Sequence, residues 1–213
     1  RKWLEKEDGS QRPIGVPTFE DKIAQRAVSM LLGAVYEEDF YNFSYGFRPG
    51  RRPHDALHEL RERSMGMKIG WILDADISGF FDSIDHEQLR EVLFKRVNDG
   101  EIVRLIGKWL QAGVLEEDIL SYSDTGTPQG GVITPKLENI FIHTVLDEWF
   151  VRVVRPRMRG RCFMVRFADD FVIGFEREDD AKRIMAVVPK RFARYGLRIH
   201  PDKTKLIPFQ KPS

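Results

Sequence analysis

Residues 162–175 of the 213-residue chain read CFMVRFADDFVIGF, in which two apolar segments flank Ala168, Asp169 and Asp170. This pattern predicts two antiparallel strands joined by a tight acidic turn. Two adjacent carboxylates in such a setting repel each other unless a cation compensates their charge. Ordinary turn chemistry also explains paired aspartates, because an aspartate side chain can cap its own backbone.

A second acidic segment, LDADISGFFD at residues 73–82, favours the explanation that a cation binds the paired aspartates of the turn. Residues 70–77 are apolar on both sides and predict a central strand, whose two-residue alternation places Asp74 and Asp76 on one face. One of these side chains can then meet the aspartates of the hairpin. Carboxylate oxygens suit magnesium, and transfer of a nucleotide to a primer hydroxyl needs two metal ions about 3.5 to 4 Å apart.

Hydrophobic periodicity and turn residues predict the other elements. We expect helices at 19–35, 54–63, 86–96, 101–111, 134–154 and 178–195, a loop at 41–52, and strands at 119–125, 197–199 and 206–209. The first helix is expected to bury one face, formed by Ile23, Ala27, Val28, Leu31, Leu32 and Val35. Thr134 is expected to be the N-cap of the fifth helix. This order predicts an α+β fold, with helices covering one face of a small antiparallel sheet and the other face open for a ligand.

Composition excludes several classes of protein. The chain is 42% hydrophobic, has one cysteine and contains no apolar run long enough to span a bilayer, so we expect an intracellular globular protein with no membrane partner. The formal net charge of +1 does not indicate a nucleic-acid partner. Arginines are nevertheless gathered in two groups, Arg152, Arg155, Arg157, Arg159, Arg161 and Arg166, and Arg48, Arg51 and Arg52. Either group could face phosphates, although a solvated face is the alternative.

Six ordered motifs extend over nearly the whole chain. They are RPIGVP at 12–17, YGFRPGR at 45–51 followed by HDAL, DISGFFD at 76–82, TPQGG at 127–131, FADD at 167–170 and GLRIHPDKT at 196–204. Through them the chain resembles the reverse transcriptases of mobile group II introns. The resemblance implies a right-hand polymerase fold with fingers at 1–69 and 83–126, palm at 70–82 and 127–213, and no thumb.

The resemblance further implies an RNA-templated DNA polymerase whose partners are an RNA template, a DNA primer, dNTPs and the group II intron RNA. It assigns metal binding to the carboxylates of Asp76, Asp169 and Asp170 and to the carbonyl of Ile77. The metal would be two Mg²⁺ ions, for which Mn²⁺ can substitute. Asp74 and Asp82 are expected to be structural.

Nucleotide and template contacts are implied in the same way. Nucleotide-binding residues would be Arg12 and Lys22 at the triphosphate, Phe81 as a steric gate at the sugar 2′ position, Gln129 and Gly130 beside the nucleotide, and Lys203 near the leaving pyrophosphate. Template-binding residues would be Arg48, Pro49, Gly50 and Arg51. Core packing is the alternative for Phe81, and a solvated turn lysine is the alternative for Lys203.

The chain departs from the family pattern at three places. Phe167 stands where tyrosine is usual, which removes a hydroxyl but keeps the ring. Lys136 and Glu138 interrupt a usually apolar run, which predicts an exposed face and suggests that these charges block surface association. The chain stops near Phe209, before the thumb, so we expect weak activity from this portion alone. Self-association stays open.

Other functions fit part of the pattern. A catalytically silent RNA-binding module would explain the fold, but the intact aspartates count against it. Retron, diversity-generating and CRISPR-associated reverse transcriptases share the same palm, and the sequence GFRPGR favours the intron type. Another palm-bearing nucleotidyltransferase, such as a cyclase, would have no use for Phe81 and Gln129.

Overall fold

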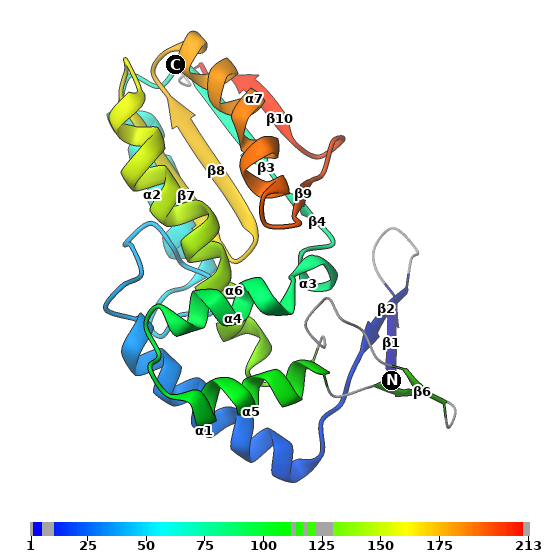
Figure 1. Cartoon of the computed structure of the whole chain (residues 1–213). Helices are drawn as coiled ribbons and strands as arrows, with labels where there is room; N and C mark the ends of the chain where they lie inside the picture. Colours follow the sequence, from blue (N-terminus) through cyan, green and yellow to red (C-terminus); the bar gives the residue numbers. More distant parts are fainter. Residues whose placement is uncertain (1, 6–10, 112–113, 117–118, 122–129, 211–213) are drawn as a thin grey trace. The chain divides into compact units, whose positions relative to one another are not determined.

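The structure, a computed structural model, describes residues 2–5, 11–111, 114–116, 119–121 and 130–210 (Figure 1). The chain forms two compact units. Unit 1 contains residues 1–38 and 81–140, and unit 2 contains residues 39–80 and 141–213. None of the helices within the described ranges combines the length and the apolar character that a membrane span requires.

Unit 1 contains helices and two small hairpins. Its helices are α1 (Phe19–Tyr36), α3 (Phe80–Ser83), α4 (His86–Phe94), α5 (Gly100–Gln111) and α6 (Thr134–Ile142), of which α3 and α6 each begin or end at the unit boundary. Its strands are β1 (Lys2–Glu5) with β2 (Gln11–Ile14), and β5 (Val114–Glu116) with β6 (Ile119–Ser121), both antiparallel. The predicted strand at 119–125 is confirmed as far as Ser121, and residues 122–125 lie outside the described ranges.

Helix α1 buries only part of the apolar set that the sequence predicted. Val28 and Leu32 are buried, as is Tyr36, whereas Ile23, Ala27 and Leu31 are exposed and Val35 is half-buried. The buried row begins at Gln25, whose Oε1 accepts a hydrogen bond from the Val132 amide at 2.8 Å. Because this buried glutamine fixes the rotation of the helix, the apolar pattern alone identified only some of the inward residues.

Unit 2 is built on a four-stranded antiparallel sheet in the order β10-β3-β8-β7. These strands are β3 (Trp71–Ala75), β7 (Cys162–Phe167), β8 (Asp170–Phe175) and β10 (Lys205–Pro208), and β4 (Ile77–Ser78) pairs separately with β9 (Arg198–Ile199). The helices of this unit are α2 (Pro53–Gly66) and α7 (Glu178–Ala193). The predicted hairpin and the central place of strand 71–75 are confirmed, as is the α+β class.

The two faces of this sheet are covered differently. Helix α7 lies along one face (Figure 1), where Phe171 stacks on Phe192 with ring centroids 5.8 Å apart. On the other face, α2 covers the β7 end through a core that includes Phe163 and Val165. The strand register places Asp74 and Asp170 on this second face, where both are exposed. The acidic end of that face therefore stays open.

The predicted long helix at 134–154 is confirmed in extent but is irregular. After α6 it continues as the wide-turned η1 (His143–Asp147) and η2 (Phe150–Val154), and ends in the 3₁₀ turn η3 (Arg155–Arg157). Arg191 of α7 donates to the Val145 carbonyl at 2.9 Å, which supplies a partner for a carbonyl of a wide turn. Thr134 is the first helical residue and not the N-cap, because the Ile133 carbonyl accepts from the Leu137 amide.

The prediction that Lys136 and Glu138 form an exposed face is wrong. Their exposed fractions are only 8% and 3%. The Lys136 Nζ atom lies 3.3 Å from Glu37 Oε1, and both residues belong to unit 1. Since neither side chain reaches the surface, these charges give no support to the idea that they block association.

Candidate active site

The acidic turn is short and has a left-handed first residue. Phe167 pairs with Asp170 across the hairpin, so Ala168 and Asp169 form the turn and Asp170 begins β8. Ala168 has a φ of 57°, a conformation that hairpin turns usually assign to glycine. The turn therefore presents two consecutive carboxylates at the end of the sheet.

The charge around Asp170 shows which carboxylates gather there. Although its side chain reaches solvent, burial by its neighbours and, in that order, the negative charges of Asp169, Asp76 and Asp74 together raise the pKa of Asp170 to about 6. Lys203 acts in the opposite direction. We call Asp74, Asp76, Asp169 and Asp170 the acid cluster. Asp74, which the sequence led us to consider structural, thus belongs to the same electrostatic environment.

Lys203 is held beside the acid cluster by its own segment. Its Nζ atom lies 3.1 Å from Asp76 Oδ2, and its amide donates to His200 Nδ1 at 3.3 Å. The His200 amide in turn donates to the Asp76 carbonyl at 2.9 Å, next to the pairing of Ile77 with Ile199. These bonds fix the segment that carries Lys203 against the residues that follow β3.

The chemistry of the acid cluster fits a hard divalent cation. Its donors are carboxylate oxygens. Burial and then the repulsion of the neighbouring carboxylates raise the pKa of Asp170, and a bound dication relieves that repulsion. Within the described ranges, however, no three acidic, histidine or cysteine side chains already lie together as a metal-holding group.

The remaining nucleotide-binding predictions fall in unit 1. Lys22 is exposed on α1, and Gly130 is exposed with a φ of 101°. Arg12 lies in β2 and Phe81 in α3, but only their backbones belong to the described part of the chain. Gln129 lies outside the described residues. The structure thus brings together the aspartates and Lys203, all in unit 2.

The four residues of the predicted template loop differ in their exposure to solvent and in their contacts. Arg48 is buried, and its Nη1 atom donates to the carbonyls of Tyr41 at 2.8 Å and Ser44 at 2.7 Å, so it holds the loop together from inside. Pro49 and Gly50 are exposed. Arg51 donates to the Asn42 carbonyl and stacks over the Tyr45 ring. Of the four predicted template residues, those at 49–51 therefore reach the surface.

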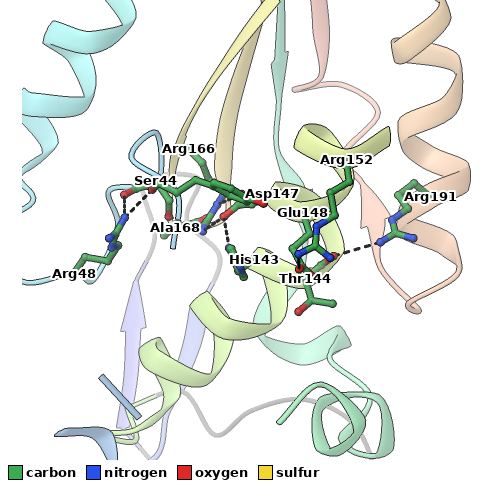
Figure 2. Close-up of polar contacts among 11 residues, drawn as sticks. Ser44, Arg48, His143, Thr144, Asp147, Glu148, Arg152, Arg166, Ala168 and Arg191 are labelled. Atoms are coloured by element: carbon green, nitrogen blue, oxygen red, sulfur yellow. Dashed lines mark hydrogen bonds and ion pairs between the residues drawn. The ribbon is translucent and has the colours of Figure 1, made fainter. Parts of the chain in front are cut away.

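A buried ion pair behind the acidic turn was missed by the sequence reasoning. Arg166 and Asp147 are both fully buried, with Nε to Oδ1 at 2.8 Å and Nη2 to Oδ2 at 2.7 Å (Figure 2). Burial would raise the pKa of Asp147, but the charge of Arg166 and the hydrogen bonds of His143 and Arg166 lower it below its ordinary value. The remaining donors of Arg166 reach Ser44 Oγ at 2.6 Å and the Ala168 carbonyl at 2.7 Å.

The suggestion that the arginine group at 152–166 faces phosphates is therefore wrong for Arg166, which is fully buried. Three others pair with carboxylates: Arg152 with Glu148 at 3.0 Å, Arg159 with Asp179 at 3.3 Å and Arg161 with Glu176 at 3.1 Å. One signal in the sequence did point to the buried pair. An arginine in the middle of the apolar strand CFMVRF needs a buried counter-charge.

Comparison with known proteins gives the family of the chain. Residues 4–211 match the reverse transcriptase (RNA-dependent DNA polymerase) family. Protein YkfC of Escherichia coli strain K12 is 36% identical over 97% of this chain and 62% of that protein. The group II intron-encoded protein LtrA of Lactococcus lactis subsp. cremoris is 39% identical over 72% of this chain and 25% of that protein.

Solved structures show the same fold at low sequence identity. Telomerase from Candida albicans, in complex with a fragment of telomeric RNA, superposes with a TM-score of 0.78 at 14% identity, over 100% of this chain and 42% of that chain. The chain spans less than two thirds of the length of each of these proteins. By the match over nearly its whole length, the chain belongs to the reverse transcriptase family.

Proposed function

We propose that the chain is the fingers and palm portion of an RNA-templated DNA polymerase of the group II intron type. The fingers would comprise 1–69 and 83–126, and the palm 70–82 and 127–213. The observation that carries this proposal is the acid cluster, in which the charges of three other aspartates help to raise the pKa of Asp170 to about 6. Family membership and the likeness to an intron-encoded protein support the class of reaction.

Within this proposal, Asp76, Asp169 and Asp170, with the Ile77 carbonyl, hold two Mg²⁺ ions, for which Mn²⁺ can substitute. Such ions supply activation of the primer 3′ hydroxyl and neutralisation of the leaving pyrophosphate. Lys203, 3.1 Å from Asp76, would donate a proton to the pyrophosphate or neutralise its charge. The surface residues 49–51 would contact the template, and Arg48 would shape their loop.

The remaining nucleotide contacts follow the family motifs. Phe81 would select deoxynucleotides at the sugar 2′ position, and Gln129 and Gly130 would lie beside the incoming dNTP. Arg12 would bind the triphosphate as a guanidinium fork, assisted by Lys22. The partners would be an RNA template, a DNA primer and the intron RNA.

Primer extension tests this proposal. The chain is incubated with an RNA template, a DNA primer, dNTPs and Mg²⁺, beside an Asp169→Ala, Asp170→Ala variant. An Asp179→Asn variant serves as a control, because Asp179 is an exposed aspartate paired with Arg177 on α7. We expect extension by the parent and by the control, and none by the double variant.

A catalytically silent RNA-binding module is the second candidate. In the same experiment, tight RNA binding without extension, unchanged in the Asp169→Ala, Asp170→Ala variant, would support this module and contradict the polymerase.

A further inference from the structure

Arg166 joins two segments that are far apart in the sequence. Strand β7 is the outer strand of the sheet, and at Arg166 the loop residue Ser44 bridges it in parallel. The Arg166 amide donates to the Phe43 carbonyl at 2.9 Å, and the Tyr45 amide donates to the Arg166 carbonyl at 2.9 Å. The loop that precedes the proposed template contacts is therefore attached to β7 at the residue that also forms the buried ion pair.

The side chain of Arg166 adds three further attachments, all visible in Figure 2. Its guanidinium plane is fixed by two bonds to Asp147. With its plane set, Nη2 also reaches Ser44 Oγ in the loop, and Nη1 reaches the Ala168 carbonyl in the acidic turn. Because guanidinium has its donors in a rigid fork, one side chain can hold the helix, the loop and the turn in a single arrangement.

Direct contact between the loop and the turn strengthens the same arrangement. A Cβ atom added at Gly46 would lie 2.2 Å from the Ala168 amide nitrogen, so the backbones of the two segments touch there. Ala168 itself has a φ of 57°, which for a residue other than glycine persists only where its surroundings fix it. The bond from Arg166 to its carbonyl and the contact with Gly46 provide those surroundings.

We propose that Asp147 and Arg166 are positioning residues that hold the turn bearing Asp169 and Asp170 in register with the template loop. This inference rests on the proposed function, because it concerns the metal ligands named there. Arg166 acts through the Ala168 carbonyl, which accepts a hydrogen bond from its Nη1 atom at 2.7 Å. Partners that orient metal ligands affect metal affinity although they do not contact the metal.

The experiment uses the full chain and two readouts. Binding of Mn²⁺ is measured by electron paramagnetic resonance, and the ¹⁵N amide signals of Ala168, Asp169 and Asp170 report the turn. The variants are Arg166→Lys, which keeps the charge but loses the fork, and Ser44→Ala, which removes one acceptor and leaves the ion pair. Arg152→Lys, at an exposed arginine paired with Glu148, is the matched control.

We expect Arg166→Lys to weaken Mn²⁺ binding by about 10- to 100-fold, the usual effect of losing a partner that orients a ligand, and to shift the turn amides. Ser44→Ala should show the same changes to a smaller degree, and Arg152→Lys should match the parent. A thermal melt of each variant separates these effects from loss of fold. If the Arg166→Lys variant does not fold, Mn²⁺ binding and the turn amides of the Ser44→Ala variant decide the test.

Folded variants that bind Mn²⁺ like the parent, with unchanged turn amides, would overturn the positioning role. Failure of the proposed function would give a different result in the Mn²⁺ measurement. In that case, the parent would bind Mn²⁺ no better than its Asp169→Ala, Asp170→Ala variant. The amide signals of the turn would then still decide whether Asp147 and Arg166 position it.

Discussion

At the scale of single residues, position 46 has no room for a side chain. A Cβ atom there would meet Ala168 backbone atoms at 2.2 and 2.7 Å. We predict that Gly46→Ala lowers the free energy of unfolding by about 1–3 kcal/mol, because the clash involves backbone that cannot rotate away. Urea denaturation followed by circular dichroism measures this change.

Gly66→Ala is the control for this prediction, since nothing lies within 4 Å of a Cβ added at Gly66. Its free energy of unfolding should stay level or rise by up to about 1 kcal/mol. Equal stability of Gly46→Ala and the parent would show that the loop can move away from the turn.

Lys136 is a second residue whose environment decides its role. We predict that Lys136→Ala lowers the free energy of unfolding by roughly 1 kcal/mol or more, because Glu37 loses its cation and the buried stem of the lysine is removed. The exposed Lys22→Ala should stay within about 0.5 kcal/mol of the parent. Sedimentation velocity should give the same coefficient for parent and Lys136→Ala, and a faster species would restore the association hypothesis.

At the scale of elements, α7 contains an unfavourable residue that packing has to offset. Pro189 lies inside this helix and is exposed, so it removes a backbone hydrogen bond without filling the core. We predict that Pro189→Ala raises the free energy of unfolding by about 1–3 kcal/mol in chemical denaturation. Pro53→Ala is the comparison, because Pro53 begins α2, where proline is well tolerated. An increase of similar size in the free energy of unfolding for Pro189→Ala and Pro53→Ala would contradict this explanation.

The elements also show how far the sequence could predict the structure. The hairpin at 162–175 was predictable, because its alternating and apolar segments flank a short acidic turn. The wide turn at 143–147 was not, because its Val145 carbonyl is satisfied by Arg191, 46 positions away along the chain. The inward face of α1 was predicted only in part for a similar reason, since Gln25 bonds to Val132, 107 positions away.

At the scale of the whole molecule, the buried ion pair should appear in the dependence of stability on pH. The pKa of Asp147 is lowered in the folded state, so its charged form stabilises the fold above the pKa of the unfolded chain, and this contribution is lost as pH falls through the folded-state pKa. We therefore predict that the difference in unfolding free energy between the parent and Asp147→Asn is largest above about pH 4 and shrinks below it.

Urea denaturation at a series of pH values between neutral and strongly acidic measures this difference. Asp179→Asn is the surface control. A hydrogen bond from Arg177 chiefly lowers the pKa of Asp179 to about 2, but its exposure lets solvent screen the interaction, so the pH-dependent difference should be much smaller. A constant difference between parent and Asp147→Asn across all pH values would contradict the lowered pKa.

The candidate site was likewise only partly predictable from the sequence. Asp76, Asp169 and Asp170 stand in short motifs whose residue types indicate metal chemistry, so their gathering was expected. Lys203 was assigned to the nucleotide only through the family resemblance, and its ion pair with Asp76 was not expected. The support behind them was not, because Arg166 and Ser44 are 122 positions apart and meet only in the folded sheet. Asp147, next to Glu148 in a helix, looked like any surface acid.

The contact of Gly46 with Ala168 also constrains how such polymerases could be engineered. A loop exchanged with that of a relative would carry its own shape at residues 43–46, while the recipient would keep the β7 residues that dock it. Mismatched halves would displace the acidic turn. Chimeras should therefore exchange residues 43–51 and 166–168 as one cassette, together with the acid at position 147, and libraries that vary the loop should keep position 46 as glycine.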